Sequence, residues 1–169
     1  MYLKVLSLFA AVVLMAACSS TPKDTGNATG AGLGNSGLSS NGTEGGIGSV
    51  RPGSQEDLAA NVGDRVFFQY NRSDLTPEAR ATIDRQAAWL KQYEQVTVTV
   101  EGHCDERGTR EYNIGLGNRR ATAVKNYLTA LGISPSRVAI ISYGKERPAV
   151  VGDTEEAFAQ NRRGVTIVN

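Results

Sequence analysis

The chain has 169 residues, of which 18 are Lys or Arg and 17 are Asp or Glu, so its formal net charge is +1 at pH 7. A nucleic-acid-binding protein carries a basic excess gathered on one face, and this balance therefore argues against nucleic acid as a partner. The single histidine and the two cysteines do not show the ligand spacing of a zinc site. We expect no metal and no other cofactor.

The first 17 residues have the pattern of an export signal. An apolar run starts near Val5, behind the basic Lys4, and ends in Ala16 and Ala17 directly before Cys18. The run is about a dozen residues long, too short for a bilayer core of ~30 Å, and is typical of a secretory signal. Because a cysteine follows the small residues, the segment resembles a bacterial lipoprotein signal, which implies several acyl chains on Cys18 and a stable membrane anchor. Ordinary cleavage, with the cysteine incidental, is the alternative.

Residues 18–54 are rich in Ser, Thr, Asn and Gly and carry few large apolar side chains. Such a segment cannot bury enough surface to offset its ordering entropy, and we predict a flexible, disordered tether. Roughly 36 residues of Gly-rich coil span ~30–35 Å. If Cys18 is lipidated, Cys104 has no partner for an internal disulfide, and we expect its thiol to be buried.

Residues 55–169 are predicted to form one folded domain. Aromatic and β-branched side chains predict a strand over 65–70. A capping hydroxyl, a proline and an acid at 76–78 predict the start of a helix that runs to about residue 93. Strict alternation of valine with polar residues predicts a second strand over 96–101.

The second half of the domain continues the alternation of helices and strands. After a loop at 105–110, the pattern predicts a helix over 111–131 that ends at Gly132. A strand over 137–143, a short helix over 155–160 and a last strand over 164–168 follow. This β-α-β-α-β order predicts an α/β fold in the broad (α+β) sense, with helices packed on one mixed sheet.

Polar and charged residues concentrate between His103 and Arg120. Continued strand alternation places Cys104 on the face of the valines and His103 on the opposite face. A thiol nucleophile and its base must lie within hydrogen-bond reach, so this pair is a poor catalytic pair. We expect Cys104 to be a small buried hydrophobe.

The helix over 111–131 carries an anomaly on its apolar face. Leu116, Val124, Tyr127 and Leu131 form one stripe, with Leu128 at its edge. Arg120 falls inside this stripe, whereas Arg119 falls outside it and is expected to be a solvated surface charge. A guanidinium on an apolar face needs a partner. Either Arg120 forms an internal pair with Asp105 or Glu101, or it faces a cleft and receives the carboxylate of a ligand.

These residues resemble the OmpA-like peptidoglycan-binding domain family, and more narrowly the lipoproteins of that family that act in the Tol–Pal system. The matching segments are 98–109, Tyr112–Asn113, Leu116, 119–121, 123–124, 127–128, 141–148 and 161–163. The resemblance covers about residue 57 to the end of the chain, and the lipoprotein signal and the tether agree with it.

The resemblance implies a ligand, the peptide stem of peptidoglycan, with meso-diaminopimelate as the recognised unit. In the family, an aspartate and an arginine at the positions of Asp105 and Arg120 hold that residue. Its free end is a zwitterion, so Asp105 can take the ammonium and Arg120 the carboxylate. Arg107, Asn113 and Leu116 are expected to line the same pocket. Asn71 completes the candidate set, although the family often has an acid there, as it has at Gln69.

The resemblance also implies where the protein acts and with what partners. Ser19 after the lipidated cysteine suggests delivery to the outer membrane, with the domain facing the periplasm. The expected partners are peptidoglycan, outer-membrane lipid, TolB and other Tol proteins, in envelope integrity and cell division. Arg162 and Arg163 are either supports of the site or surface charges.

Two other classes of protein stay open as alternatives to a binding module. An anchored enzyme that remodels peptidoglycan would need two carboxylates across a bond, one with a raised pKa. Asp105 and Glu106 are adjacent and precede Arg107, a setting that lowers the pKa of a carboxyl group. We therefore expect no enzyme. A flagellar-stator-like relative would keep an uncleaved transmembrane helix.

Overall fold

The computed structural model of the chain describes residues 50–169. The predicted signal at 1–17, the lipid attachment at Cys18 and the tether up to residue 49 lie outside the described residues. Next to the predicted start of the domain, Gly53 donates its backbone N–H to the Asp57 carboxylate and the Ser54 side chain caps the first helix. Between residues 50 and 169, no helix is both long enough and apolar enough to cross a membrane.

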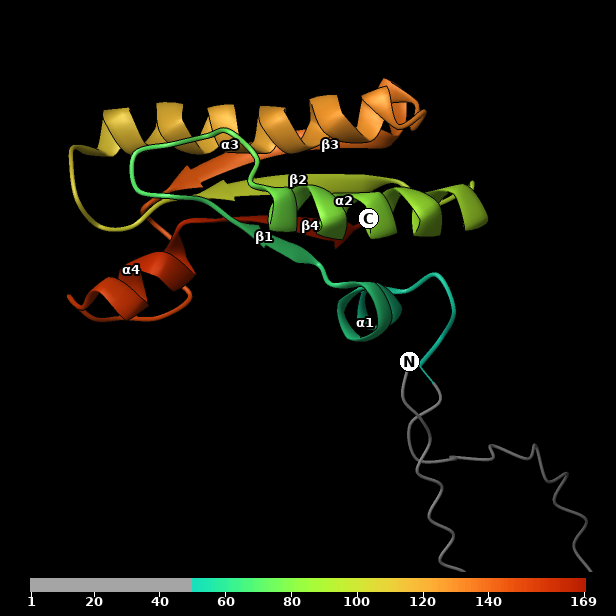
Figure 1. Cartoon of the computed structure of the whole chain (residues 1–169), viewed down its shortest axis with the longest axis horizontal. Coiled ribbons are helices and arrows are strands. Elements are labelled where there is room, and N and C mark those ends of the chain that lie inside the picture. The colour runs from blue at the N-terminus through green and yellow to red at the C-terminus, as the bar shows by residue number, and fades with distance from the viewer. Residues whose placement is uncertain (1–49) are drawn as a thin grey trace, which may run out of the picture. The chain divides into compact units, whose positions relative to one another are not determined.

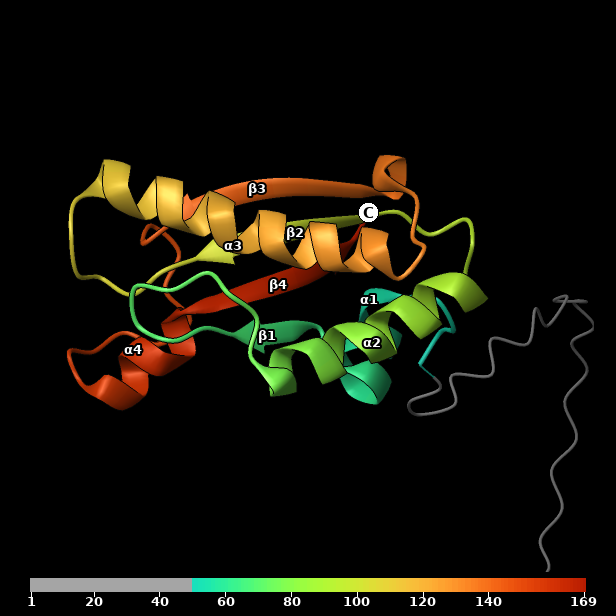
Figure 2. The same ribbon diagram turned by 45° about the horizontal axis from the view of Figure 1, so that its top comes forward.

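Four strands form one mixed sheet, as the sequence predicts. The elements in chain order are α1 (Gln55–Asp57), η1 (Leu58–Val62), β1 (Arg65–Phe67), α2 (Pro77–Gln92), β2 (Val98–His103), α3 (Arg110–Ala130), η2 (Pro135–Arg137), β3 (Val138–Gly144), α4 (Glu155–Asn161) and β4 (Arg163–Val168). The strand order is β1-β4-β2-β3, with β2 and β3 parallel and the other pairs antiparallel. Helices α2 and α3 lie over one face of the sheet, and α4 lies at the end towards which β2 runs (Figures 1 and 2).

The core lies between the sheet and the helices α2 and α3. Its fully buried apolar side chains include Ile83 and Leu90 from α2, Val98 and Val100 from β2, and Val124 and Leu128 from α3. Two glycines let α3 approach β2 closely, because a Cβ atom on Gly102 would lie 1.9 Å from the carbonyl oxygen of Gly117. This approach brings the first turns of α3 to the end of β2.

The predicted helices agree with the structure more closely than the predicted strands. Helices α2 and α3 start and end within one residue of the expected bounds. The first strand is shorter than predicted because the chain leaves the sheet after Phe67, and the carbonyl of Gln69 is bonded to a side chain instead. The second strand begins two residues late because the carbonyl of Val96 accepts bonds from Arg137. The short elements α1, η1 and η2 were not predicted.

The apolar face of α3 is also centred differently from the prediction. Leu128 is fully buried, whereas Tyr127 and Leu131 are only partly buried. The close contact of Gly117 with the sheet fixes the face of α3 that also carries Ala121 and Val124. The prediction that placed Leu128 at the edge of the stripe is therefore wrong.

Candidate functional site

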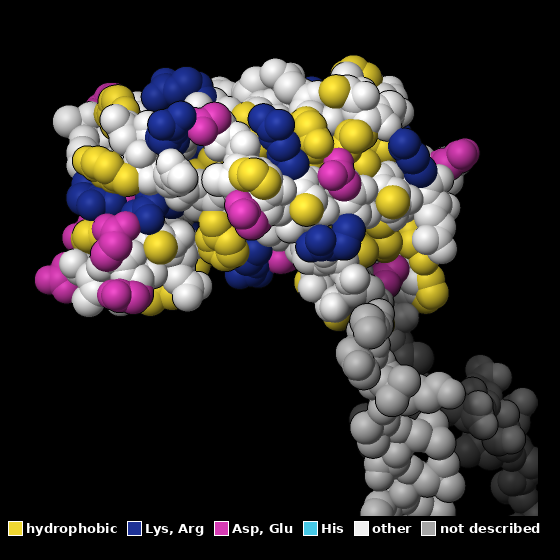
Figure 3. Space-filling view, viewed as in Figure 1, with side chains coloured by type: hydrophobic (Ala, Val, Ile, Leu, Met, Phe, Trp, Pro, Cys, Tyr) yellow, Lys and Arg dark blue, Asp and Glu magenta, His cyan; other side chains and the backbone are white. Residues whose placement is uncertain are grey.

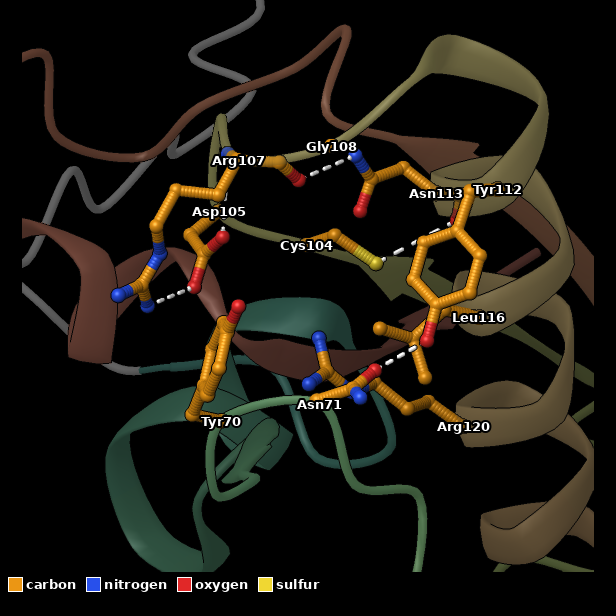
Figure 4. A pocket seen from close by; sticks show the side chains of 10 residues that line it. All are labelled: Tyr70, Asn71, Cys104, Asp105, Arg107, Gly108, Tyr112, Asn113, Leu116 and Arg120. Atoms are coloured by element: carbon orange, nitrogen blue, oxygen red, sulfur yellow. Dashed lines mark hydrogen bonds and ion pairs between the residues drawn. The ribbon is translucent and has the colours of Figure 1, made fainter.

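A cavity of 340 Å³ opens at the end of β2, between the β1–α2 loop and the first turns of α3. Its lining residues are Tyr70, Asn71, Cys104, Asp105, Arg107, Gly108, Tyr112, Asn113, Leu116 and Arg120 (Figure 4). The structure thus brings all six candidate pocket residues, Asn71, Asp105, Arg107, Asn113, Leu116 and Arg120, to the wall of one cavity.

Arg120 is fully buried, as its place in the apolar stripe predicts, and Arg119 is exposed. The Nε of Arg120 donates to the carbonyl of Arg72 at 2.8 Å. Its Nη1 donates to the carbonyl of His103 at 2.8 Å, and its Nη2 to that of Gln69 at 3.1 Å. These bonds fasten the β1–α2 loop to the end of β2. Within residues 50–169, no carboxylate forms an ion pair with Arg120, so the expected alternative of an internal pair is wrong.

The guanidinium of Arg120 keeps hydrogen-bonding capacity towards the cavity. A guanidinium has five N–H donors. Three of these donors reach backbone carbonyls, so one N–H remains on each terminal nitrogen. Burial lowers the pKa of Arg120, yet an arginine remains charged in a protein. A carboxylate placed in the cavity could accept both remaining donors and neutralise this charge.

Asp105 lies on the same cavity wall with only 5% of its surface exposed. Arg107 donates to it from Nη2 at 2.6 Å and from its backbone N–H at 3.2 Å, and Arg162 Nη1 lies at 3.4 Å. Burial alone would raise the pKa of Asp105, but the hydrogen bonds and charge of Arg107, with help from Arg162, hold that pKa below its ordinary value. The predicted direction is confirmed for Asp105, which is a carboxylate at neutral pH.

Helix α4 supports this carboxylate through two arginines. The guanidinium carbon of Arg107 lies 4.1 Å from the ring centre of Tyr70 and 4.4 Å from the ring centre of Phe158. Arg162 donates to the Phe68 carbonyl at 3.1 Å, and its Nη2 lies 2.8 Å from a Glu155 carboxylate oxygen. In the space-filling view, acidic side chains gather over α4, below basic side chains near the start of α3 (Figure 3).

Both arginines of the last predicted motif are buried, so the surface-charge alternative is wrong for each. Arg162 has 7% of its surface exposed and Arg163 has 8%. Arg162 supports Asp105 directly, whereas Arg163 donates to the carbonyls of Asn161 and Arg147.

Asn113 presents an oriented acceptor to the cavity. Its Nδ2 donates to the carbonyl of Arg107 at 2.8 Å and to that of Thr109 at 3.0 Å, which uses both N–H groups of the amide. The Oδ1 atom is therefore left as an acceptor, and it points towards the interior of the cavity (Figure 4). Asp105 and Asn113 together give this part of the wall the chemistry of an ammonium site.

Cys104 and His103 point to opposite sides of β2, as the strand alternation predicts. The Cys104 thiol is buried and donates to the Asn113 carbonyl at 3.4 Å. The His103 imidazole lies 3.2 Å from the Glu101 carboxylate and stacks near Tyr143. Burial raises the pKa of the Cys104 thiol, so it stays protonated. The described residues 50–169 contain no group of three His, Cys, Asp or Glu side chains that could hold a metal ion.

The lining of the cavity also includes Tyr70 and Tyr112, which are not among the site residues predicted from the sequence. The Tyr112 hydroxyl donates to Oδ1 of Asn71, a residue in the left-handed region with φ of 55°, and this bond joins the loop to α3. Tyr112, Leu116 and Arg120 stand four residues apart and therefore share one face of a helix. That spacing could have added Tyr112 to the candidates from the sequence.

Comparison with known proteins places this geometry in a family. The OmpA family model matches residues 67–162. The chain is 45% identical over 154 residues to the peptidoglycan-associated lipoprotein of Rhizobium meliloti, covering 91% of this chain and 81% of that protein. It is 46% identical over 157 residues to the peptidoglycan-associated lipoprotein of Pseudomonas aeruginosa, covering 92% of each.

Solved structures share the same fold. The crystal structure of the peptidoglycan-associated lipoprotein from Burkholderia pseudomallei matches with a TM-score of 0.64 and 32% identity, covering 68% of this chain and 98% of that one. The C-terminal domain of Helicobacter pylori MotB matches with a TM-score of 0.59 at 22% identity, covering 63% of this chain and 84% of that one, which shows likeness of fold alone.

The chain therefore belongs to the OmpA family. Within that family, its identity to the lipoproteins of Rhizobium and Pseudomonas over most of their length makes it a member of the peptidoglycan-associated lipoprotein group.

Proposed function

We propose that the domain binds the peptide stem of peptidoglycan without covalent chemistry, and that the cavity at the end of β2 receives the free end of meso-diaminopimelate. In this proposal Arg120 donates hydrogen bonds to the carboxylate of the ligand, and Asp105 accepts hydrogen bonds from its ammonium. The names of the relatives, which describe association with peptidoglycan, support the proposal.

The buried charge of Arg120 is the observation that carries this proposal. Its side chain is 0% exposed, lines the cavity and has backbone carbonyls but no carboxylate as partners. A buried charge is costly unless it is paired, so the cavity is suited to a ligand that carries a carboxylate.

The opposite wall suits the other half of a zwitterion. Asp105 is held ionised, and the free Oδ1 of Asn113 adds a second acceptor for an ammonium. Leu116 and Cys104 give the cavity an apolar surface that fits the methylene chain between the two ligand charges. Arg107 and Asn71 then complete the wall of the cavity. Arg107 orients Asp105, and Asn71 is held by its hydrogen bond with Tyr112.

The proposal extends to the cell envelope as a whole. A lipidated Cys18 would anchor the chain in the outer membrane, so that the domain in the periplasm links that membrane to the cell wall. TolB and other Tol proteins are the proposed protein partners, in envelope integrity and cell division. Mass spectrometry of the mature amino terminus tests the anchor, and fractionation of the membranes tests its location.

We propose a binding protein rather than an enzyme, because Asp105 is the one carboxylate among the residues that line the cavity. Its pKa is lowered by its arginine partners, whereas a glycan hydrolase needs a second carboxyl group with a raised pKa. Incubation with purified sacculi should therefore release no muropeptides. Turnover would favour the alternative of an anchored remodelling enzyme.

Calorimetric titration with two stem peptides tests the ligand. A peptide with diaminopimelate should bind, and a matched peptide with lysine, which lacks the terminal carboxylate, should bind ten- to hundredfold more weakly, because a charge-assisted hydrogen bond contributes ~1.5–3 kcal/mol. An Arg119→Ala variant is the matched control and should keep the preference. Equal affinity for the two peptides would contradict the assignment of Arg120.

A further inference from the structure

We propose that the cavity distinguishes the free carboxylate of the ligand tip from the corresponding carboxamide, so that amidation of the cell-wall peptide releases this protein. This inference rests on the proposed function and concerns the chemical state of the ligand at the same site. It follows from the way in which the fold fixes the guanidinium of Arg120 and leaves its charge unmatched.

The hydrogen-bonding directions of Arg120 are fixed before any ligand arrives. Its three nitrogens donate to carbonyls at 2.8, 2.8 and 3.1 Å that come from two separate segments of the chain. The guanidinium cannot rotate without breaking these bonds. The two remaining N–H groups, one on each terminal nitrogen, are best matched by a ligand group with two acceptor atoms. A carboxylate has two such oxygens, whereas a carboxamide has one oxygen and an NH₂ group that can only donate.

The acceptors that the lining offers to that NH₂ group, apart from those assigned to the ligand ammonium, are neutral: the hydroxyls of Tyr70 and Tyr112 and Oδ1 of Asn71. Leu116 and Cys104 are the neighbouring apolar parts of the wall. The Oδ1 atom of Asn71 already accepts the hydroxyl of Tyr112. The acceptors Asp105 and Asn113 belong to the part of the wall assigned to the ligand ammonium. A carboxamide would therefore give up one of the two charge-assisted hydrogen bonds to Arg120 and turn its own donor towards a remaining N–H of the guanidinium, which lowers the affinity.

The charges around the cavity act in the same direction. The single carboxylate of the lining, Asp105, favours the charged form of Arg120 but forms its own ion pairs with Arg107 and Arg162, so Arg120 keeps no ion-pair partner among the lining residues. A zwitterionic tip brings no net charge and places its carboxylate on Arg120. An amidated tip is a cation, and it would enter a site in which the buried guanidinium stays unpaired.

The test uses the full-length chain and four synthetic stem peptides that differ in the last functional group alone. The group is a free carboxylate, a primary carboxamide, a methyl ester or, in the lysine peptide, hydrogen. The expected order has the carboxylate tightest and the carboxamide at least tenfold weaker, close to the lysine peptide, because one charge-assisted bond is worth a factor of ten or more. The ester, which lacks both the charge and the N–H donors, should also bind more weakly than the acid.

The outcomes separate this inference from the proposed function. If the acid and the carboxamide bind equally while the lysine peptide binds weakly, the carboxamide inference is overturned and the proposed function stands. If the acid itself does not bind, the proposed function fails. An ester that binds as tightly as the acid would also overturn the role of charge. An Arg119→Gln variant, changed at the exposed neighbour, should show the same preference for the acid as the parent.

Discussion

Asp105 and Arg120 line the same cavity but do not pair with each other. Asp105 is held by Arg107 and Arg162, and Arg120 is held by the backbone carbonyls of two other segments. Opposite charges are thus kept apart by separate supports. Because neither charge has to break a bond with the other before a ligand binds, the cavity is preorganised for a ligand with two charges.

Replacing Arg120 should affect stability as well as binding. In Arg120→Ala, three carbonyl groups lose a charged donor, and a large buried side chain is removed. We expect the free energy of unfolding to fall by about 2–5 kcal/mol, and retention on sacculi to be lost. Urea denaturation followed by circular dichroism measures the first effect, and a pull-down at a temperature where the variant is folded measures the second.

Arg119→Ala is the matched control for this experiment. Arg119 is exposed and lies over the Tyr112 ring at 6.0 Å without a salt bridge in the described part of the chain. Its removal should change the free energy of unfolding by about 0.5 kcal/mol or less and leave the pull-down intact. If Arg119→Ala abolished retention on sacculi and Arg120→Ala did not, the roles of the two arginines would be exchanged.

Arg162 should act as a positioning residue for Asp105, because it is not among the residues that line the cavity. Its removal in Arg162→Gln takes away one of the charges that lower the pKa of Asp105. In the parent, Asp105 stays ionised as the pH falls to below its ordinary pKa near 3.9, and binding should persist there. In the variant, the pKa of Asp105 rises, so binding of the stem peptide should decline at a higher pH.

The pH profile of binding separates this role from a general loss of structure. Arg65→Gln is the control, because Arg65, the first residue of β1, is half exposed and pairs with the preceding residue Asp64. Its profile should superimpose on that of the parent. If Arg162→Gln weakens binding equally at every pH, Arg162 does not act through the ionisation of Asp105.

The sequence predicted those features that local chemistry determines. The Thr76 cap and Pro77 at the start of α2, and the alternation of Val98 and Val100 in β2, follow from short-range patterns, and the structure confirms them. The helical period also identified Arg120 as the charge on an apolar face.

The partners of these residues could not be predicted, because they are distant in the chain and many are backbone atoms. Arg120 donates to carbonyls 48 and 51 residues away in the chain. The pattern of side chains in a sequence does not predict where a backbone carbonyl oxygen will lie. Arg107 contacts two rings, those of Tyr70 and Phe158, that only the folded chain brings to it. Side-chain type thus indicated which residues carry charge, and the fold determined which groups compensate it.

The crossing of α3 over β2 should depend on Gly117. A Cβ atom there would lie 2.3 Å from Ser142 Oγ and 2.8 Å from the Gly102 carbonyl oxygen. Alanine is normally favoured over glycine inside a helix by about 1 kcal/mol. We nevertheless expect Gly117→Ala to lower the free energy of unfolding by about 1–3 kcal/mol, because the backbone must shift to relieve the overlap. Urea denaturation of the purified protein measures this change.

Gly115, two residues earlier in the same helix, is the matched control. The nearest atom to a Cβ there is Arg119 Nη1 at 3.5 Å, an ordinary contact with a flexible side chain. Gly115→Ala should therefore leave the free energy of unfolding unchanged or raise it by up to about 1 kcal/mol. Stabilisation by both substitutions would show that the two elements do not need the close approach.

Stability should depend on pH through His103, the one histidine of the chain. Burial, followed by the charge of Arg163, lowers the pKa of His103, and the neighbouring Glu101 does not fully offset these effects. The unfolded chain binds a proton on this imidazole near pH 6.5, whereas the folded chain keeps it neutral at that pH. The free energy of unfolding should therefore be highest above pH 6.5 and decrease as the pH falls from about 7 towards the lowered pKa of the folded state.

Urea denaturation between pH 5 and 8 measures this slope, which one group limits to about 1.4 kcal/mol per pH unit. His103→Gln keeps a polar side chain near Glu101 and should flatten the slope between pH 7 and 5. NMR titration of the imidazole in the parent gives an independent reading, because a single histidine yields a single set of ring signals. A pKa at or above 6.5 in the folded protein would contradict the prediction, since the proton would then favour the folded state or act equally on both.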